Sequence, residues 1–373
     1  MKFDTLAVHA GAEVDRETGA VAPPIHLSTT FRHGPAGELV DELEYQRDDH
    51  PTQRRLQAAL AALEGGERAL AFASGMAAVA AVLDTLQCGQ RWLLADDCYA
   101  GTRTFAAEVL SERGVETVTV DLADLDAVRA ASTGGVALLW AESPSNPRIR
   151  ISDIAELARI AHAHGALLVC DNTFATPVLQ KPLQLGADIV MHSTTKYFGG
   201  HSDVLGGALV FARNDDFAER IAQRRLLGGA VLSPFSAWLT LRGCRSLPAR
   251  MRVHCANAAR VAEFLDTHPE VEVVHYPGLP AHPGHALAKQ QMSGFGGMLS
   301  IQLRGGREAA LRVASKLKLF INATSLGGCE SLVEHRASVE GTHSTSPQNL
   351  LRFSIGLEDP EDLIADLQQA LAA

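Results

Sequence analysis

Between residues 53 and 212, short apolar runs alternate with segments in which apolar residues recur at helical spacing. The apolar runs lie at 68–74, 91–96, 115–121, 136–143, 166–172, 187–193 and 206–212. Helical periodicity is found at 53–63, 75–86, 102–114, 124–131 and 151–165. Strands that alternate with helices are joined by crossover connections, which make neighbouring strands parallel. The sequence therefore predicts an α/β domain with a largely parallel sheet.

The sequence on either side of this alternation has a different character. Residues 1–52 show no strong periodicity and predict an extended N-terminal arm. Residues 244–269 form one long helical pattern, which is followed by apolar runs at 271–278, 296–303 and 350–358 and a helix at 307–317. We therefore expect three parts: an arm at 1–52, an α/β domain at 53–243 and a smaller α+β domain at 244–373.

Charge and composition argue against several classes of protein. With 33 Lys+Arg against 43 Asp+Glu, the net charge of −10 disfavours non-specific binding to nucleic acid or to an anionic membrane. No apolar stretch approaches the roughly 18 residues of a membrane span, and the first residues lack the apolar core of a secretory signal. The six scattered cysteines predict buried free thiols, and the 15 histidines show no metal-ligand spacing. We expect a cytoplasmic protein without a metal site.

Polar and aromatic residues follow several of the apolar runs. In an open parallel sheet, ligands bind beyond the carboxyl ends of the strands, so these residues are the candidates for a site. They combine a glycine turn that opens a helix, a ring, an amide, a carboxylate, hydroxyls and an amine: Gly75, Met76, Tyr99, Asn146, Asp171, Ser193, Thr195 and Lys196. Each of them alone is equally well explained as a turn, surface or core-edge residue. Their convergence on one edge of one sheet favours a shared function.

This set of groups suits the cofactor pyridoxal 5′-phosphate (PLP), which needs an amine, a carboxylate, a stacking face and a phosphate cup. Lys196 would form the Schiff base with the aldehyde of PLP. Asp171 would keep the ring nitrogen protonated, and Tyr99 would stack on the ring. The helix N-terminus and nearby hydroxyls would form the phosphate cup: Gly75, Met76, Ser193 and Thr195. Once substrate displaces it, Lys196 would become a base that moves protons between carbon atoms.

The segment DNTFATPVLQKPLQLGADIVMHSTTKYFGGHSDVLGG at 171–207 resembles the cofactor-lysine signature of the Cys/Met-metabolism PLP enzymes. Further similar segments extend the resemblance over nearly the whole chain: HAGAEVDRETGAVAPPIHLSTTF, YQRDDHPT, SGMAA, DDCYAGT, ESPSNP, SLGGCESL and LLRFSIGLED. The resemblance implies the fold-type I architecture of PLP-dependent transferases. It also implies a trans-sulfuration enzyme of sulfur amino-acid metabolism.

The resemblance assigns further residues that spacing alone does not. Tyr45 and Arg47 match a pair that reaches the cofactor phosphate from a neighbouring subunit, which implies a homodimer as the minimal active unit and a tetramer as the common assembly. Asn146 and Arg352 match residues that hold the substrate carboxylate, and Asn146 also lies close to the cofactor. Ser325 belongs to the same substrate-binding rim. From the sequence itself, Arg352 is an arginine in an apolar strand that needs an anionic partner.

The chain departs from the family pattern at four places. The loop after Tyr99 reads Ala-Gly-Thr, so Gly101 stands where typical methionine γ-lyases have cysteine. Thr324 stands where γ-synthases and γ-lyases tend to have glutamate and β-lyases tyrosine. Asp48-Asp49-His50 replaces the usual small or amide residues, and two acids there would either favour a second ammonium group on the substrate or be solvated turn residues. Glu334-His335-Arg336 replaces a commoner His-Pro pairing, and no physical reason for this is visible in the sequence.

Several activities remain in competition at this stage. The leading hypothesis is elimination or replacement at the γ-carbon of cystathionine or an O-acyl-homoserine, as in cystathionine γ-synthases and γ-lyases. The alternatives are cystathionine β-lyase, methionine γ-lyase and homoserine-ester sulfhydrylase activity. A non-catalytic PLP-fold binding protein is a more remote alternative, because it would leave a complete set of cofactor contacts without a use.

Overall fold

A computed structural model describes residues 1–340 and 344–372 of the chain. Its large sheet has the strand order β1-β7-β6-β5-β4-β2-β3. The strands are β1 Arg68–Phe72, β2 Arg91–Ala95, β3 Glu116–Val120, β4 Leu138–Glu142, β5 Leu167–Asp171, β6 Ile189–His192 and β7 Gly207–Phe211. All neighbouring pairs are parallel except those of β7, which runs antiparallel to β6 and β1. The predicted α/β fold with a largely parallel sheet is confirmed.

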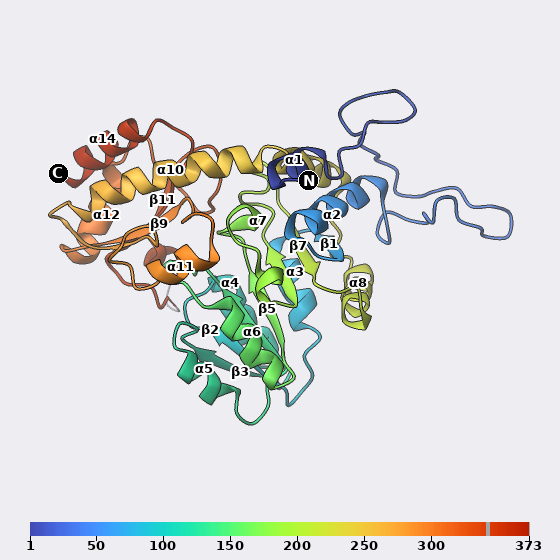
Figure 1. The fold of residues 1–373 in the computed structure, drawn as a ribbon, viewed down its shortest axis with the longest axis horizontal. Coiled ribbons are helices and arrows are strands. Elements are labelled where there is room, and N and C mark those ends of the chain that lie inside the picture. The colour runs from blue at the N-terminus through green and yellow to red at the C-terminus, as the bar shows by residue number, and fades with distance from the viewer. Residues whose placement is uncertain (341–343, 373) are drawn as a thin grey trace.

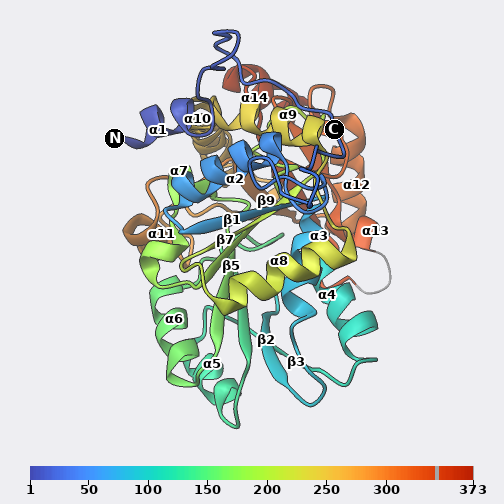
Figure 2. The ribbon, with the colours of Figure 1, turned by 90° about the vertical axis from the view of Figure 1, so that its right-hand side faces the viewer.

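Helices cover both faces of this sheet, and α8 crosses in front of it in Figure 2. They are α2 Pro51–Glu64, α3 Gly75–Leu83, α4 Ala100–Phe105 with a π-helical turn at Ala106–Leu110, α5 Leu125–Ser132, α6 Ile154–Ala163, α7 Thr176–Leu179, a 3-10 turn at Pro182–Leu185, α8 Asp216–Gly228 and α9 Pro234–Cys244. In β1, Leu70 and Phe72 face the core shared with α3, α6 and α8, whereas Ala69 and Ala71 face the core shared with α2 and α9. Successive side chains of a strand point to opposite faces, so both faces of β1 are buried.

Helix α2 illustrates how local sequence defines an element. The His50 ring accepts a hydrogen bond from the backbone N–H of Thr52 at 3.3 Å, and Pro51 occupies the first helical position, where its missing N–H costs nothing. The helix ends at Gly65, whose φ of 81° lies in the left-handed region that glycine adopts without strain. His50, Pro51 and Gly65 therefore define where α2 begins and ends, which the helical spacing of apolar residues alone does not.

The second sheet has the order β10-β11-β12-β9-β8. Its strands are β8 Val271–His275, β9 Met298–Leu303, β10 Ile321–Asn322, β11 Leu332–Glu334 and β12 Leu350–Ser354. The helices of this part are α10 Leu247–Asp266, α11 His285–Gln291, α12 Gly306–Lys316, α13 Arg336–Glu340 and α14 Pro360–Leu371. Helix α10 runs from the large sheet to the small one in Figure 1, and with α12 and α14 it shares a core with β9 and β12. The predicted domain boundary near residue 243 stays a prediction.

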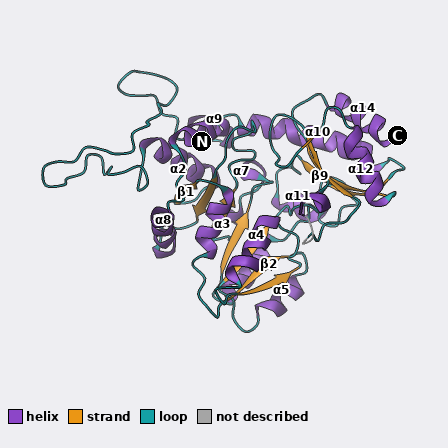
Figure 3. Cartoon of the chain, turned by 180° about the vertical axis from the view of Figure 1, so that it is seen from behind, coloured by secondary structure: helices purple, strands orange, loops and turns teal. Residues whose placement is uncertain are grey.

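The N-terminal region is only partly the extended arm that we predicted. It begins with a helix, α1 Phe3–His9, which buries Ala7 and is too short to produce a visible period in the sequence. After α1, most side chains up to Asp49 are exposed, and the chain projects away from the body in Figures 1 and 3. The arm therefore makes few contacts with its own subunit.

No helix in residues 1–340 and 344–372 is long and apolar enough to span a membrane. The six cysteines are free thiols, but the expectation that they are buried holds only for Cys98, Cys170 and Cys244. Cys255 and Cys329 are partly buried, and Cys88 is exposed. Cys88 lies in the turn between α3 and β2, and connecting segments of this kind run over the surface.

Candidate active site

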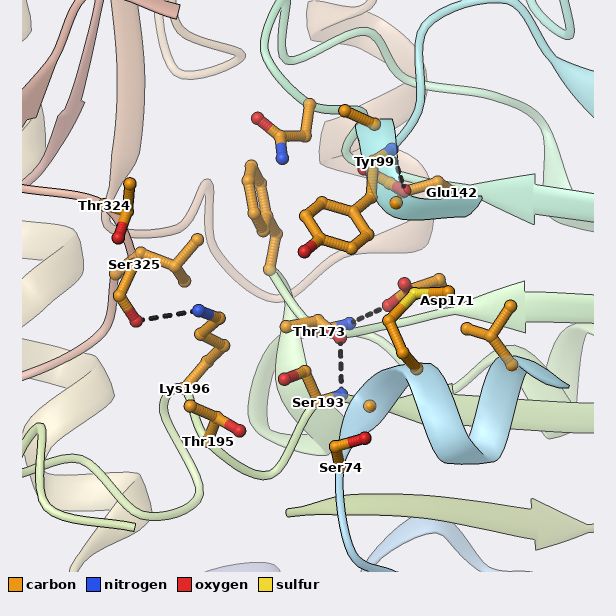
Figure 4. A pocket seen from close by; sticks show the side chains of 18 of the residues that line it. Ser74, Tyr99, Glu142, Asp171, Thr173, Ser193, Thr195, Lys196, Thr324 and Ser325 are labelled. Atoms are coloured by element: carbon orange, nitrogen blue, oxygen red, sulfur yellow. Dashed lines mark hydrogen bonds between the residues drawn. The ribbon is translucent and has the colours of Figure 1, made fainter. Parts of the chain in front are cut away.

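A cavity of about 560 Å³ lies beyond the carboxyl ends of the large-sheet strands, where loops of the second sheet close it. Predicted site residues from both sheets line it: Gly75, Met76, Tyr99, Asn146, Asp171, Ser193, Thr195, Lys196, Ser325 and Arg352. Figure 4 shows how many of these side chains point toward one another. The structure thus brings residues separated by up to 277 positions in the sequence, from Gly75 to Arg352, into one site.

The amine of Lys196 is half-buried in this cavity. Its Nζ donates a hydrogen bond to Ser325 Oγ at 2.7 Å, and the two side chains face each other in Figure 4. Burial, together with the positive charge of Arg352, lowers the pKa of Lys196 to about 8. Ser325 has a φ of 86°, a conformation that costs energy in a residue with a side chain and is held here by a bond from Arg352 Nη2 to its carbonyl at 3.0 Å.

Two carboxyl groups lie side by side at the ends of adjacent parallel strands. Asp171 ends β5 and Glu142 ends β4, and the two are direct partners in the sheet register. Burial raises the pKa of both groups, and the charge of Asp171 raises that of Glu142 further. Hydrogen bonds from Thr173, including its N–H to Asp171 Oδ1 at 3.0 Å, oppose the rise at Asp171. We therefore expect Asp171 to carry the negative charge and Glu142 to stay protonated.

Tyr99 precedes helix α4, and its ring faces the cavity with 44% of the residue exposed. The Tyr99 backbone N–H donates to Glu142 Oε2 at 2.9 Å, so the carboxyl beside Asp171 also fixes the start of α4. A Cβ atom on Gly101 would come within 2.4 Å of the tyrosine ring. Because Gly101 has no side chain, the Tyr99 ring has room to lie beside it.

The N-terminus of helix α3 forms one end of the cavity. Ser74 Oγ accepts from the N–H of Ala77 at 3.0 Å and caps the helix, and Gly75 follows as the first helical residue. A Cβ on Gly75 would lie 3.1 Å from Ser193 Oγ, so any other residue would fill this end of the cavity. Thr195 Oγ1 bonds to the backbone of Gly206 at 3.1 Å, which holds the loop in place.

Arg352 lies on β12 of the second sheet, lines the cavity and is 4% exposed. It donates to Asn146 Oδ1 at 3.0 Å, and its Nη2 lies 2.6 Å from Glu334 Oε2. The anionic partner that the sequence required for this buried arginine is therefore Glu334, its direct neighbour across β11 and β12. Burial lowers the pKa of Arg352 to about 10, and the charge of Glu334 opposes this effect.

Tyr45 and Arg47 do not line the cavity of their own chain. Both are exposed on the arm, where the Arg47 guanidinium lies 5.7 Å from the centre of the Tyr45 ring. Asp49 beside them forms an ion pair with Arg54 of α2. Their predicted contact with the phosphate of a neighbouring subunit stays a prediction.

Comparison with known proteins identifies the group to which the chain is related. The family model described as Cys/Met metabolism PLP-dependent enzyme matches residues 4–372. The chain belongs to this family. Cystathionine gamma-synthase of Mycobacterium tuberculosis is 48% identical, with 98% of this chain and 96% of that protein covered. Cystathionine beta-lyase of Coxiella burnetii is 43% identical, with coverages of 99% and 97%. The chain is also similar to a solved structure, the crystal structure of cystathionine gamma synthase from Xanthomonas oryzae pv. oryzae in complex with aminoacrylate and cysteine. The two structures superpose with a TM-score of 0.96 at 42% sequence identity, and the match covers 100% of this chain and 98% of that one.

The chain is thus a PLP-dependent enzyme with the fold-type I architecture. Its cavity fits the cofactor on independent structural grounds. The amine of Lys196 and the carboxylate of Asp171 open into one space beside the ring of Tyr99, and the open cradle at Gly75 lies at a helix N-terminus that suits a phosphate.

Sequence reasoning missed several residues of this site. Glu142 carried a usable signal, since it ends an apolar run just as Asp171 does. The segment with Glu334 and Arg336 was noted only as a departure from the family pattern, and Glu340 carried no signal, because nothing in the sequence shows that Arg336 and Glu340 line the cavity. Arg336 forms ion pairs with Glu334 and Glu340, which supplies the physical account that the Glu334-His335-Arg336 segment lacked.

Proposed function

We propose that this chain replaces the acyloxy group of an O-acyl-homoserine by the sulfur of cysteine: the bond from the γ-carbon to the ester oxygen breaks, a carbon–sulfur bond forms, and the products are cystathionine and the free carboxylic acid. The observation that carries the proposal is the state of Lys196. Its amine is half-buried, has a pKa lowered to about 8 by burial, and donates a hydrogen bond to the hydroxyl group of Ser325. Chemistry at the γ-carbon requires protons to leave first the α-carbon and then the β-carbon, and an amine of this kind can take up and release both.

The surrounding residues suit the binding and orientation of an amino-acid substrate. Arg352, already fixed by Glu334, would bind the α-carboxylate, and Asn146 would donate its amide N–H groups to the same region. Ser325 holds the Lys196 amine by one hydrogen bond and would keep it beside the carbons that lose protons. PLP, when bound, withdraws electrons from the α-carbon so that the proton can leave.

A second group of residues would hold the cofactor. Asp171 would keep the ring nitrogen protonated, because an ionised carboxylate in a buried site stabilises a positive partner strongly. The tyrosine ring would cover the cofactor ring. The phosphate would lie at the start of α3 and the loop after β6, formed by Gly75, Met76, Ser193 and Thr195.

A product assay on the PLP-loaded protein tests the proposal. With an O-acyl-homoserine and cysteine, the expected products are cystathionine and the carboxylic acid in equal amounts, and Lys196→Ala should form neither. Cystathionine alone should be the second substrate tested. Release of homocysteine and pyruvate from it would mean β-lyase chemistry and would overturn the proposal, whereas cysteine and 2-oxobutyrate without any replacement product would make the enzyme a γ-lyase.

We also propose that a homodimer is the minimal active unit, within a tetramer. Among the described residues that line the cavity, the cations are Lys196, Arg336 and Arg352. Lys196 is hydrogen-bonded to Ser325, and both arginines are ion-paired with Glu334, so each already has a partner from the second part of the chain. The exposed arm carries Arg47 away from its own body and would supply the missing charge to a neighbouring subunit.

Mixed dimers provide the decisive test of the trans arrangement. Arg47→Ala and Lys196→Ala should each be inactive or strongly impaired. After unfolding and refolding together, each heterodimer should contain one site with an intact lysine from one subunit and an intact arm from the other. Recovery of activity is the expected result, and no recovery despite confirmed subunit exchange would show that the arm acts within its own chain.

A further inference from the structure

Arg336 has a buried guanidinium group and lines the cavity. Neither the proposed cofactor contacts nor the proposed binding of the substrate α-carboxylate by Arg352 involves it. It begins α13, is 5% exposed and lines the cavity together with Thr324, Val339 and Glu340. Its Nη1 donates to Glu334 Oε2 at 2.9 Å and its Nη2 donates to Glu340 Oε1 at 2.7 Å. Its Nε is buried and has no acceptor among the described residues. A buried donor without an acceptor is costly, so a ligand that satisfies it gains affinity.

Glu340, the acidic neighbour of Arg336 that lines the cavity, has no acceptor capacity left. Glu340 accepts from Arg336, from Ser344 Oγ at 2.8 Å and from Ser346 Oγ at 2.9 Å, and Arg103 Nη2 lies 3.4 Å from its Oε1. A carboxylate offers about four acceptor positions, so Glu340 is saturated. Glu334 does not line the cavity. This part of the cavity therefore offers the Nε donor of Arg336 to a ligand, which suits a group that accepts hydrogen bonds, such as a carboxylate.

The balance of charge narrows the kind of anion. Arg336 belongs to a cluster of ion pairs in which three guanidinium groups, those of Arg103, Arg336 and Arg352, pair with two carboxylates, Glu334 and Glu340. Under the proposed function, the α-carboxylate at Arg352 balances the single surplus charge. A further carboxylate is then accommodated best when it brings its own ammonium group, as in an amino acid, and an acyl chain ending in a carboxylate would add an uncompensated charge.

We propose that Arg336 binds the carboxylate of the amino-acid thiol, and so the distal carboxylate of cystathionine. This inference rests on the proposed function and adds a second carboxylate subsite to it. Arg336 is then a specificity-determining residue that selects thiols bearing a carboxylate.

The test compares thiols on the PLP-loaded full chain, with O-acetyl-homoserine as the first substrate because its acyl group lacks a carboxylate. Cysteine and 3-mercaptopropionate carry the carboxylate, and cysteamine does not. In Arg336→Gln, the ratio of kcat/KM for cysteine to that for cysteamine should fall about 10- to 100-fold, as expected for a charge-assisted hydrogen bond. The ratio of kcat/KM for 3-mercaptopropionate to that for cysteamine should fall as well, and Arg336→Lys should recover part of each ratio. The ratio cancels any general loss of activity or folding.

The matched control is Arg307→Gln, which removes an arginine from α12 that does not line the cavity. An unchanged cysteine-to-cysteamine ratio in Arg336→Gln would overturn the inference and leave Arg336 a purely structural residue. If instead KM rises for O-succinyl-homoserine while the thiol ratio stays constant, the acyl carboxylate occupies the site, and the assignment to the thiol is wrong.

A binding measurement separates failure of this inference from failure of the proposed function. In Lys196→Ala protein loaded with PLP, Kd is measured for cystathionine and for S-ethyl-homocysteine, which lacks the distal amino-acid end. Adding Arg336→Gln should weaken cystathionine binding at least 10-fold relative to S-ethyl-homocysteine. This result is expected even if no replacement product forms, and equal weakening of both ligands would refute the subsite.

Discussion

Replacing Lys196 by methionine should stabilise the cofactor-free protein at neutral pH while abolishing activity. Burial lowers the pKa of this amine from its ordinary value of 10.5 to about 8. At about 1.36 kcal/mol per pH unit, the buried ammonium costs roughly 3 kcal/mol of folding free energy. The variant also loses the hydrogen bond to Ser325, worth about 1 kcal/mol. We therefore expect a net gain of about 2 kcal/mol in the free energy of unfolding.

The pH dependence of this gain follows from the lowered pKa. Below pH 8 the folded and unfolded states both carry the ammonium, so the full cost is present. Between pH 8 and 10.5 the unfolded chain binds more protons than the folded chain, and the stability of the unsubstituted protein rises with pH. Above this range the amine is neutral in both states. The advantage of the variant should therefore disappear as pH rises toward 10.5.

Urea unfolding followed by circular dichroism measures both effects, at one protein concentration because the proposed dimer would make stability depend on concentration. The control is Lys289→Met on α11, which replaces an exposed lysine and should change stability by less than about 0.5 kcal/mol. The reasoning would be refuted by a Lys196→Met variant that is no more stable at pH 7. An advantage that persists unchanged at high pH would refute it equally.

Three further predictions concern the cofactor site. Asp171→Asn should lower kcat by about 100-fold or more, because the buried negative charge is lost. Glu142→Gln should lower kcat less than about fivefold, because that carboxyl is expected to be neutral. Steady-state kinetics and the absorption of bound PLP measure both effects, and a larger loss of kcat in Glu142→Gln would contradict the assignment. Gly75→Ala should weaken PLP binding about 10-fold, since the added methyl group would lie 3.1 Å from Ser193 Oγ. Titration of the cofactor-free protein with PLP measures the Kd, and an unchanged Kd would disprove the prediction. Ser325→Ala should lower kcat about 10-fold by freeing the lysine amine. A kcat equal to that of the unsubstituted protein would exclude a role for the hydrogen bond.

The large sheet and most of the cavity were predictable because parallel strands place their carboxyl ends at one edge. Asp171, Ser193 and Lys196 meet there for that reason, and each follows an apolar run in the sequence. Helices α8 and α9 were not predicted, since Phe235 and Leu227 are exposed apolar residues that blur the helical pattern. Helix α1 was missed because seven residues are too few to show a period.

The sequence by itself determined the alternation of strands and helices, the glycine at the phosphate end, and the lysine and carboxylate that suit the cofactor. These are local properties, set by the spacing of apolar residues and by what each side chain can do. Only the tertiary structure decided that Glu142 stands beside Asp171 and that Glu334 joins Arg352 to Arg336. Such contacts depend on strand order, register and the packing of one sheet against the other, which are long-range outcomes of burying the cores. The charge of the substrate end of the cavity is therefore a property of the fold.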